Sequence, residues 1–183
     1  MQRRITAMEK ERNEIDVIII NTPVLAGASV RLAKLPVPEE PIEVAYREKA
    51  FTAIYNGVVN RPVTRVLLST KSGYKMKALA LWDTGAVNSC VSESALKKLD
   101  SSPVDADRKC CILAPNNMQE SEYHKLEMEI PGVKKYQPIM VARYDFLDTQ
   151  NIDVLIGMDI ISDGRFVIDT KSGNTQLSFE LNN

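Results

Sequence analysis

One carboxylate lies at the end of an apolar run, a position that often holds a functional side chain. Asp83 follows an apolar run, residues 75–82, and precedes a small hydroxyl residue and a glycine, Thr84 and Gly85. An apolar run that ends in a charged group beside flexible backbone is typical of a strand that presents a functional side chain. Because burying a lone charge is costly, Asp83 needs a partner or a solvent-lined cleft. The plain alternative is a capping aspartate, since Asp-Thr-Gly is also good turn chemistry.

Other groups that could do chemistry have weaker patterns. His124 is the single histidine, and without a second histidine or a thiol pair we expect it on the solvated surface. Ser89 lacks the Gly-x-Ser-x-Gly elbow of serine hydrolases. Asp153 and Asp159 are expected in ion pairs or helix capping rather than at a metal ion. The sequence therefore predicts no metal site and no cofactor.

Composition excludes several classes of function. The 183 residues carry 23 basic and 24 acidic side chains, a net charge of -1, so we expect neither a nucleic-acid partner nor a membrane partner. The longest apolar run, residues 17–20, is too short to span a bilayer, and the N-terminus does not resemble a signal peptide. Cys90, Cys110 and Cys111 are an odd number without CxxC spacing, which favours reduced thiols. We expect a soluble, cytoplasmic protein.

The elements that must position Asp83 are predicted to be short strands separated by turns, which is typical of an all-β barrel or sandwich. Asn56-Gly57 and residues 71–73 are expected to form hairpin turns. One helix is predicted after Ser92 as its N-cap, and a second is expected to stop at Gly164. The predicted strands are residues 51–55, 58–59, 63–69, 74–82, 110–113, 123–130, 137–143, 152–157, 166–169 and 175–181, and the predicted helices are residues 93–99 and 158–163.

The first 49 residues have a different character. Residues 3–14 favour a solvated helix, residues 16–20 a strand, and residues 25–35 either a second strand or a loop. Three prolines within residues 36–41 then interrupt regular structure. We therefore expect an N-terminal accessory segment, residues 1–49, before a domain of residues 50–183. Its role as regulator, removable pro-segment or dimerisation arm stays open.

Two segments resemble motifs of the retropepsin-like (retroviral-type) aspartic proteases. Residues 81–86, Leu-Trp-Asp-Thr-Gly-Ala, resemble the active-site loop of that family. Residues 154–161, Val-Leu-Ile-Gly-Met-Asp-Ile-Ile, resemble its apolar-apolar-Gly segment with the helix that follows, and are most similar to the bacterial branch. The predicted hairpin around residues 114–117 lies where the flap of the family would be. The resemblance covers about residues 50–181 and implies a retropepsin-like closed barrel or β-sandwich with a flap hairpin and one or two short helices.

The resemblance also implies an activity. A chain with one Asp-Thr-Gly has half of a site, so two chains would pair as a homodimer and activate a water with two Asp83 carboxylates to hydrolyse a peptide bond. Thr84 would hydrogen-bond across the dimer and Gly85 would permit close approach of the substrate. The remaining implied residues are Ala86, Asn88, Pro115, Asn116 and Asn117, which would contact the substrate, and Leu155, Ile156 and Gly157, which would pack behind the loop.

Two features depart from the family pattern. The expected flap tip, residues 114–118, contains no glycine, although asparagine tolerates left-handed backbone. Trp82 is large for the position before the aspartate and is expected to be either a specificity residue or a core residue. The glycine-free tip keeps an alternative open, in which the chain is a catalytically weak or silent dimeric module for peptide binding or assembly.

Overall fold

The structure is a computed structural model that describes residues 16–19, 38–105, 109–114 and 117–182. In these ranges the fold is all-β with short helices, as predicted. The strands are β1 (Asp16–Ile19), β2 (Glu43–Arg47), β3 (Ala50–Ile54), β4 (Val63–Ser69), β5 (Lys75–Trp82), β6 (Cys90–Val91), β7 (Lys109–Ala114), β8 (Asn117–Ile130), β9 (Lys134–Arg143), β10 (Val154–Ile156), β11 (Gly164–Asp169) and β12 (Gln176–Leu181). The helices are α1 (Glu93–Lys98), α2 (Phe146–Thr149) and α3 (Met158–Ile161).

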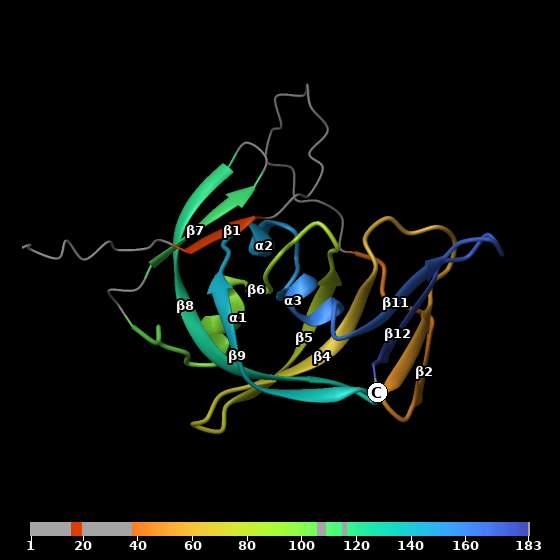
Figure 1. The fold of residues 1–183 in the computed structure, drawn as a ribbon, viewed down its shortest axis with the longest axis horizontal. Coiled ribbons are helices and arrows are strands. Elements are labelled where there is room, and N and C mark those ends of the chain that lie inside the picture. The colour runs from red at the N-terminus through yellow and green to blue at the C-terminus, as the bar shows by residue number, and fades with distance from the viewer. Residues whose placement is uncertain (1–15, 20–37, 106–108, 115–116, 183) are drawn as a thin grey trace, which may run out of the picture.

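Six strands close into a barrel, which confirms the expected architecture. They are hydrogen bonded in the order β8-β4-β5-β10-β6-β9, and β9 pairs with β8 to complete the ring. Closure leaves these strands without a free sheet edge along the paired part. Beyond β8 the sheet continues to β7 and then to β1, which pairs in parallel with β7. Figure 1 shows this extension at one end of the molecule.

A second sheet lies at the opposite end of the molecule (Figure 1) and has the order β11-β12-β3-β2. Its two C-terminal strands, β11 and β12, were predicted from the sequence, and they pair antiparallel. Strand β2 was not predicted, and it pairs with β3 from Glu43↔Ile54 to Arg47↔Ala50. The sheet therefore includes residues from before position 50, while the division of the chain at residue 49 stays a prediction.

From Ala78 to Trp82, strand β5 is buried on both faces and separates two clusters of core side chains. Ala78, Ala80 and Trp82 belong to the larger cluster, whereas Leu79 and Leu81 belong to the smaller one. This alternation follows from the two-residue period of a strand. An element buried on both sides is difficult to displace, so the residue that follows β5 has a fixed starting point.

Trp82 takes the core role of the two that the sequence left open. Its side chain is only 3% exposed, and its Nε1–H donates to Thr64 Oγ1 at 2.9 Å. The indole stacks on Phe166 with ring centroids 5.4 Å apart and lies against Phe51 and Phe179. A buried indole with its N–H satisfied contributes a large apolar surface without an unpaired polar group.

Helix α1 and the β4–β5 hairpin form as the sequence predicts. Ser92 caps α1, because its Oγ accepts from the Ala95 N–H at 3.1 Å, a contact generally worth about 1 kcal/mol. The β4–β5 turn is closed by a hydrogen bond from the Thr70 N–H to the Tyr74 carbonyl at 3.0 Å. Gly73 in this turn has a φ of +97°, which a side chain would disfavour. Within the described ranges no helix has the length and apolar character needed to cross a bilayer.

Two turn predictions were wrong. Asn56-Gly57 does not join two paired strands, because β3 already pairs with β12 and β2 on its two edges. Gly57 has the expected positive φ of +79°, but its carbonyl accepts from the Thr175 N–H at 2.7 Å, so the turn docks on the segment before β12. Gly164 does not cap α3 but begins β11, where a Cβ would lie 2.3 Å from the Glu180 carbonyl oxygen.

Some predicted elements fall outside the described residues, namely the helix of residues 3–14 and the strand or loop of residues 25–35. The strand predicted at residues 16–20 is present as β1. Helix α2 was not predicted. It has only four residues, and its N-cap residue, Asp145, makes no side-chain capping hydrogen bond. It is instead held by tertiary packing, with Leu147 buried in the smaller core cluster.

Candidate active site

Asp83 is the first residue after β5, and its backbone is fixed to the neighbouring strand β10. The Asp83 N–H donates to the Ile156 carbonyl at 3.0 Å, and the Asp83 carbonyl accepts from the Ala86 N–H at 3.2 Å. The carboxylate is partly buried, and its Oδ1 accepts from the Gly85 N–H at 2.8 Å. The side chain is therefore held in place yet not sealed inside the chain.

The residues after Asp83 divide by exposure. Thr84 is exposed and Gly85 partly exposed, so both can meet a second molecule. The Ala86 side chain is completely buried in the smaller core cluster, and its carbonyl accepts from the Met158 N–H at 2.8 Å. Asn88 is partly buried. A contact between Ala86 and a substrate stays a prediction and would have to use its backbone.

The predicted backing segment lies directly against this loop. Leu155 and Ile156 are buried in β10, which runs parallel to β5 with Ile156 opposite Trp82. Gly157 follows, and a Cβ there would lie 2.7 Å from the carbonyl carbon of Asn88. No side chain fits that space without a backbone shift, so the glycine permits close packing of the segment on the loop.

A further pair of residues at this site was not found from the sequence. Ser89 is buried, and both its N–H and its Oγ–H donate to the carboxylate of Asp159, at 3.0 and 2.8 Å. Its Oγ also accepts from the Gly157 N–H at 3.1 Å. The two residues are 70 positions apart, so their pairing leaves no local pattern. The available signal was only that each lies at the end of a segment already assigned to the site.

The flap candidate is present as the β7–β8 hairpin. Ala114 and Asn117 are its last paired positions, and Asn117 begins β8. Pro115 and Asn116 lie outside the described residues. The strands that support the tip are long, since β8 runs from Asn117 to Ile130 and also pairs with β4 and β9.

The expected surface position of His124 is wrong. Its side chain is only 4% exposed and its Nδ1 lies 3.1 Å from Ser101 Oγ. The cause is its place in β8, where it is opposite Val141 of β9 on one side and bridged to Pro103 on the other. The segment after α1, through Ser101 and Pro103, thus lies against a residue that looks solvated from its charged sequence neighbours.

The other polar candidates have structural partners. The Asp153 carboxylate accepts from the Leu79 N–H at 2.8 Å and lies 3.9 Å from Lys98 Nζ, so the predicted ion pair is present. Cys90 and Cys110 are completely buried, and Cys90, Cys110 and Cys111 carry free thiols. Burial, with Asp159 and Cys110 adding, raises the pKa of the Cys90 thiol far above its usual value, so this thiol stays protonated and acts as a small apolar group.

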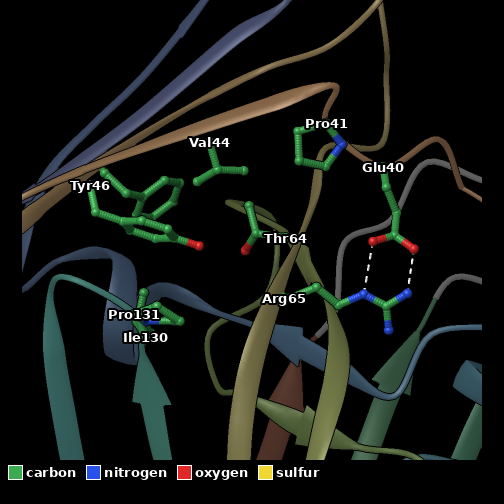
Figure 2. A pocket seen from close by; sticks show the side chains of 9 residues that line it. Glu40, Pro41, Val44, Tyr46, Thr64, Arg65, Ile130 and Pro131 are labelled. Atoms are coloured by element: carbon green, nitrogen blue, oxygen red, sulfur yellow. Dashed lines mark hydrogen bonds and ion pairs between the residues drawn. The ribbon is translucent and has the colours of Figure 1, made fainter.

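Two hollows on the chain lie away from Asp83. One, of about 130 Å³, has apolar walls from Val44, Ile130 and Pro131 (Figure 2). At its rim Figure 2 shows the Glu40 carboxylate facing the Arg65 guanidinium, and Arg65 Nε donates to Glu40 Oε2 at 2.8 Å. The other hollow, of about 300 Å³, lies between α1 and β8. Asp83 lines neither hollow.

Comparison with known proteins places this arrangement in a family. A family model described as retroviral aspartyl protease matches residues 60–182. Among solved structures, a retropepsin-like aspartic protease from Rickettsia conorii is 16% identical with a TM-score of 0.38, covering 68% of this chain and 98% of that one. The retroviral protease-like domain of Ddi1 from Leishmania major is 16% identical with a TM-score of 0.37, covering 67% and 93%. No curated protein matches the chain.

The family match includes β5, the Asp83 loop, the flap hairpin and the β10 segment behind the loop. It spans more than half of the chain. The chain therefore belongs to the retroviral aspartyl protease family.

Proposed function

We propose that this protein is an aspartic endopeptidase that works as a homodimer with one Asp83 carboxylate from each subunit. The observation that carries the proposal is the placement of Asp83, whose backbone is fixed to β10 and whose partly open carboxylate is oriented by the Gly85 N–H. The sequence contains a single Asp-Thr-Gly. A two-fold dimer would therefore complete the pair of carboxylates that this reaction needs.

In the proposed reaction the two Asp83 carboxyl groups share one proton, because like charges a few ångströms apart do not both ionise. The ionised carboxylate takes a proton from a water molecule, whose oxygen forms a bond to the peptide carbonyl carbon. The other carboxyl donates its proton to the carbonyl oxygen and so stabilises the tetrahedral intermediate. When the C–N bond breaks, the leaving nitrogen receives the proton that the first carboxylate took from the water, and one hydroxyl of the intermediate returns its proton to the other carboxylate. The products are two shorter peptides, and the dyad again holds one proton.

The neighbouring residues have supporting roles in this proposal. Exposed Thr84 would hydrogen-bond to the loop of the partner subunit, and Gly85 would let substrate approach the carboxylates. Asn88 and the backbone of Ala86 would contact the substrate from below, and flap residues 115–117 from above. Leu155, Ile156 and Gly157 would keep the loop in place from behind, which their packing against it supports.

The first test is the substitution Asp83→Asn, which keeps the size of the side chain and removes the charge. We expect the wild type to cleave an unfolded protein somewhere between about pH 4 and about pH 7, and the variant to give no products, since the amide cannot act as the base. Products are identified by mass spectrometry. Asp163→Asn is the matched control, because Asp163 forms an exposed ion pair with Lys134 at 3.3 Å, away from the loop.

Equal cleavage by the wild type and Asp83→Asn would show that the proposal is wrong. The same experiment addresses the alternative function, a dimeric module that binds or assembles peptides without turnover, which the glycine-free flap tip favours. Stoichiometric peptide binding that yields no product and is unchanged by Asp83→Asn would support that alternative. A cytoplasmic location is also proposed, and the free thiols of Cys90, Cys110 and Cys111 support it.

A further inference from the structure

The far end of the Asp83 loop is anchored by a second carboxylate. Asp159 receives two hydrogen bonds from Ser89, one from its N–H at 3.0 Å and one from its Oγ–H at 2.8 Å. Ser89 Oγ in turn accepts from the Gly157 N–H at 3.1 Å. Ser89 is 1% exposed, so these groups have little access to water as a replacement partner. The three contacts join the loop to the start of α3.

We propose that Ser89 and Asp159 form a positioning pair that sets the location of the Asp83 carboxylate for its meeting with the second Asp83. This inference rests on the proposed function and assigns no contact with substrate to either residue. Asp83 would be the catalytic group, and the pair would act on it through the backbone of residues 83–89.

The chemistry of Asp159 suits this task. An ionised carboxylate offers acceptor sites on both oxygens and can receive an N–H and an O–H from one residue at the same time. Hydrogen bonds to a charged acceptor are stronger than neutral ones. Removing the carboxylate would leave the buried Ser89 N–H without its acceptor, which is unfavourable because a buried donor has no water to replace the lost partner. The loop would then shift to find another partner.

The backbone between the Ser89–Asp159 pair and Asp83 is held by further contacts. The Ile156 carbonyl accepts from the Asp83 N–H at 3.0 Å, and the Val87 carbonyl accepts from the Asp159 N–H at 3.0 Å. Gly157 packs so closely on Asn88 that even a methyl group would not fit. Hydrogen bonds and close packing therefore connect the loop to residues 156–159 along its length. Because tightly packed groups cannot move independently, a shift of Ser89 would also shift Asp83.

The other side of the pair is rigid as well. Asp159 lies in the first turn of α3, whose Ile160 and Ile161 are buried in the larger core cluster. The core therefore fixes the backbone that carries the carboxylate. A functional side chain is held precisely when the residues that support it are themselves fixed by packing, and Asp159 on α3 meets this condition.

The experiment uses the full-length chain and three measurements on each variant. Ser89→Ala, Asp159→Ala and the double substitution remove the pair. Ser89→Thr keeps the hydroxyl, whereas Asp159→Asn replaces one of the two acceptor oxygens with a donor NH2 and so breaks one of the two hydrogen bonds. Asp163→Asn is the matched control, as an acidic residue just after α3 that contacts Lys134 instead. The measurements are kcat and KM, the thermal midpoint, and the NMR signal of the Gly85 amide, which donates to Asp83 Oδ1 and reports on its position.

We expect each alanine variant to lose roughly 100-fold in kcat with KM little changed, since a misplaced catalytic group costs about that much. The double variant should be no worse than either single one, because both remove the same pair. The Gly85 amide signal should shift in the alanine variants and stay in place in Ser89→Thr and in the control. A residue with only a structural role would change the thermal midpoint but leave the kcat of the folded molecules and the Gly85 signal unchanged.

Folded alanine variants with wild-type kcat and an unshifted Gly85 amide would overturn the inference. If the alanine variants do not fold, Asp159→Asn decides: a lowered kcat and a shifted Gly85 amide support the pair, and wild-type values for both overturn it. If the wild-type protein cleaves nothing, the proposed function fails, and the Gly85 signal alone decides whether Ser89 and Asp159 position Asp83.

Discussion

Two residues near Asp83 differ in the space that their side chains occupy: Trp82 has a large side chain, and Gly157 has none. Trp82 fills the core beneath the loop with the largest side chain available, and its N–H is satisfied by Thr64. Gly157 leaves room where the backbone of Asn88 would collide with any side chain. Trp82 therefore stabilises the strand that leads to Asp83, and Gly157 allows the loop to pack closely on β10. A substitution at either position would act on Asp83 without touching it.

His124 is a single residue with a predictable effect on stability. Burial lowers its pKa below the ordinary 6.5, Arg143 lowers it further, and the nearby Glu122 raises it. Its Nε2 has no hydrogen-bond partner among the described residues and lies 3.9 Å from Glu122 Oε1. The folded chain therefore keeps His124 neutral at pH values where an unfolded chain protonates it.

We expect the free energy of unfolding to fall as the pH drops below about 6.5, because the unfolded state then binds a proton that the folded state does not. This loss continues until the pH reaches the lowered pKa of the folded state. Urea denaturation of the wild type and His124→Gln between about pH 5 and about pH 8 measures it. The chain has one histidine, so the variant should lack the histidine-dependent slope. Equal slopes in both proteins would contradict the prediction.

At the scale of elements, the flap candidate carries an additional strand. β1 pairs in parallel with β7, the outer strand of the β7–β8 hairpin, in a register that places Val17 opposite Cys111. Residues 16–19 therefore occupy an edge that would otherwise be open to another strand. The role of the N-terminal segment stays open, but its pairing with β7 can be tested with a native thiol.

We expect Val17→Cys to form a disulfide with Cys111 under mild oxidation. Paired positions on adjacent strands lie about 4.8 Å apart, within the Cα separation that a disulfide accepts, and Cys111 is a free, partly buried thiol. Peptide mapping by mass spectrometry would identify the link.

Ile19→Cys is the control for this link, because Ile19 pairs with Leu113 and has no thiol opposite. It should remain unlinked under the same conditions. A Val17→Cys protein that keeps its thiols free, or that links no better than Ile19→Cys, would show that β1 does not occupy the edge of β7 in solution.

At the scale of the whole molecule, the proposed dimer makes activity depend on pairs of chains. Wild type and Asp83→Asn are mixed in equal amounts under conditions where subunits exchange. Random pairing leaves about one quarter of the dimers with two aspartates. Activity should then fall to about half of that from the same amount of wild type alone.

Adding Asp163→Asn in place of Asp83→Asn is the control and should raise activity, because its loop is intact. Sedimentation of each sample verifies that dimers are present. If Asp83→Asn leaves the activity of the wild type unaffected while subunits exchange, each chain acts alone and the dimeric site is wrong.

Most of the barrel could be predicted from the sequence, because its strands carry local signals. The apolar run of β5, the Ser92 cap and the turn at Gly73 are each signals contained within a few residues. Partners far apart in the chain could not be predicted, such as Ser89 with Asp159, or β3 with β12. His124 was misplaced for the same reason, since segments distant in sequence lie against it. The motifs predicted that residues 155–157 pack behind the Asp83 loop, whereas the Ser89–Asp159 contact was visible only in three dimensions.

The parallel pairing of β5 with β10 has a consequence for how the protein is made. The loop after β5 is completed by contacts that span 68 to 70 positions, from Ser89 to Gly157 and Asp159. Contacts of such long range form late in folding, because a large stretch of chain must be ordered first. During synthesis the ribosome must release residue 159 before the loop can take its final shape. A nascent chain therefore carries Asp83 long before the loop around it can form.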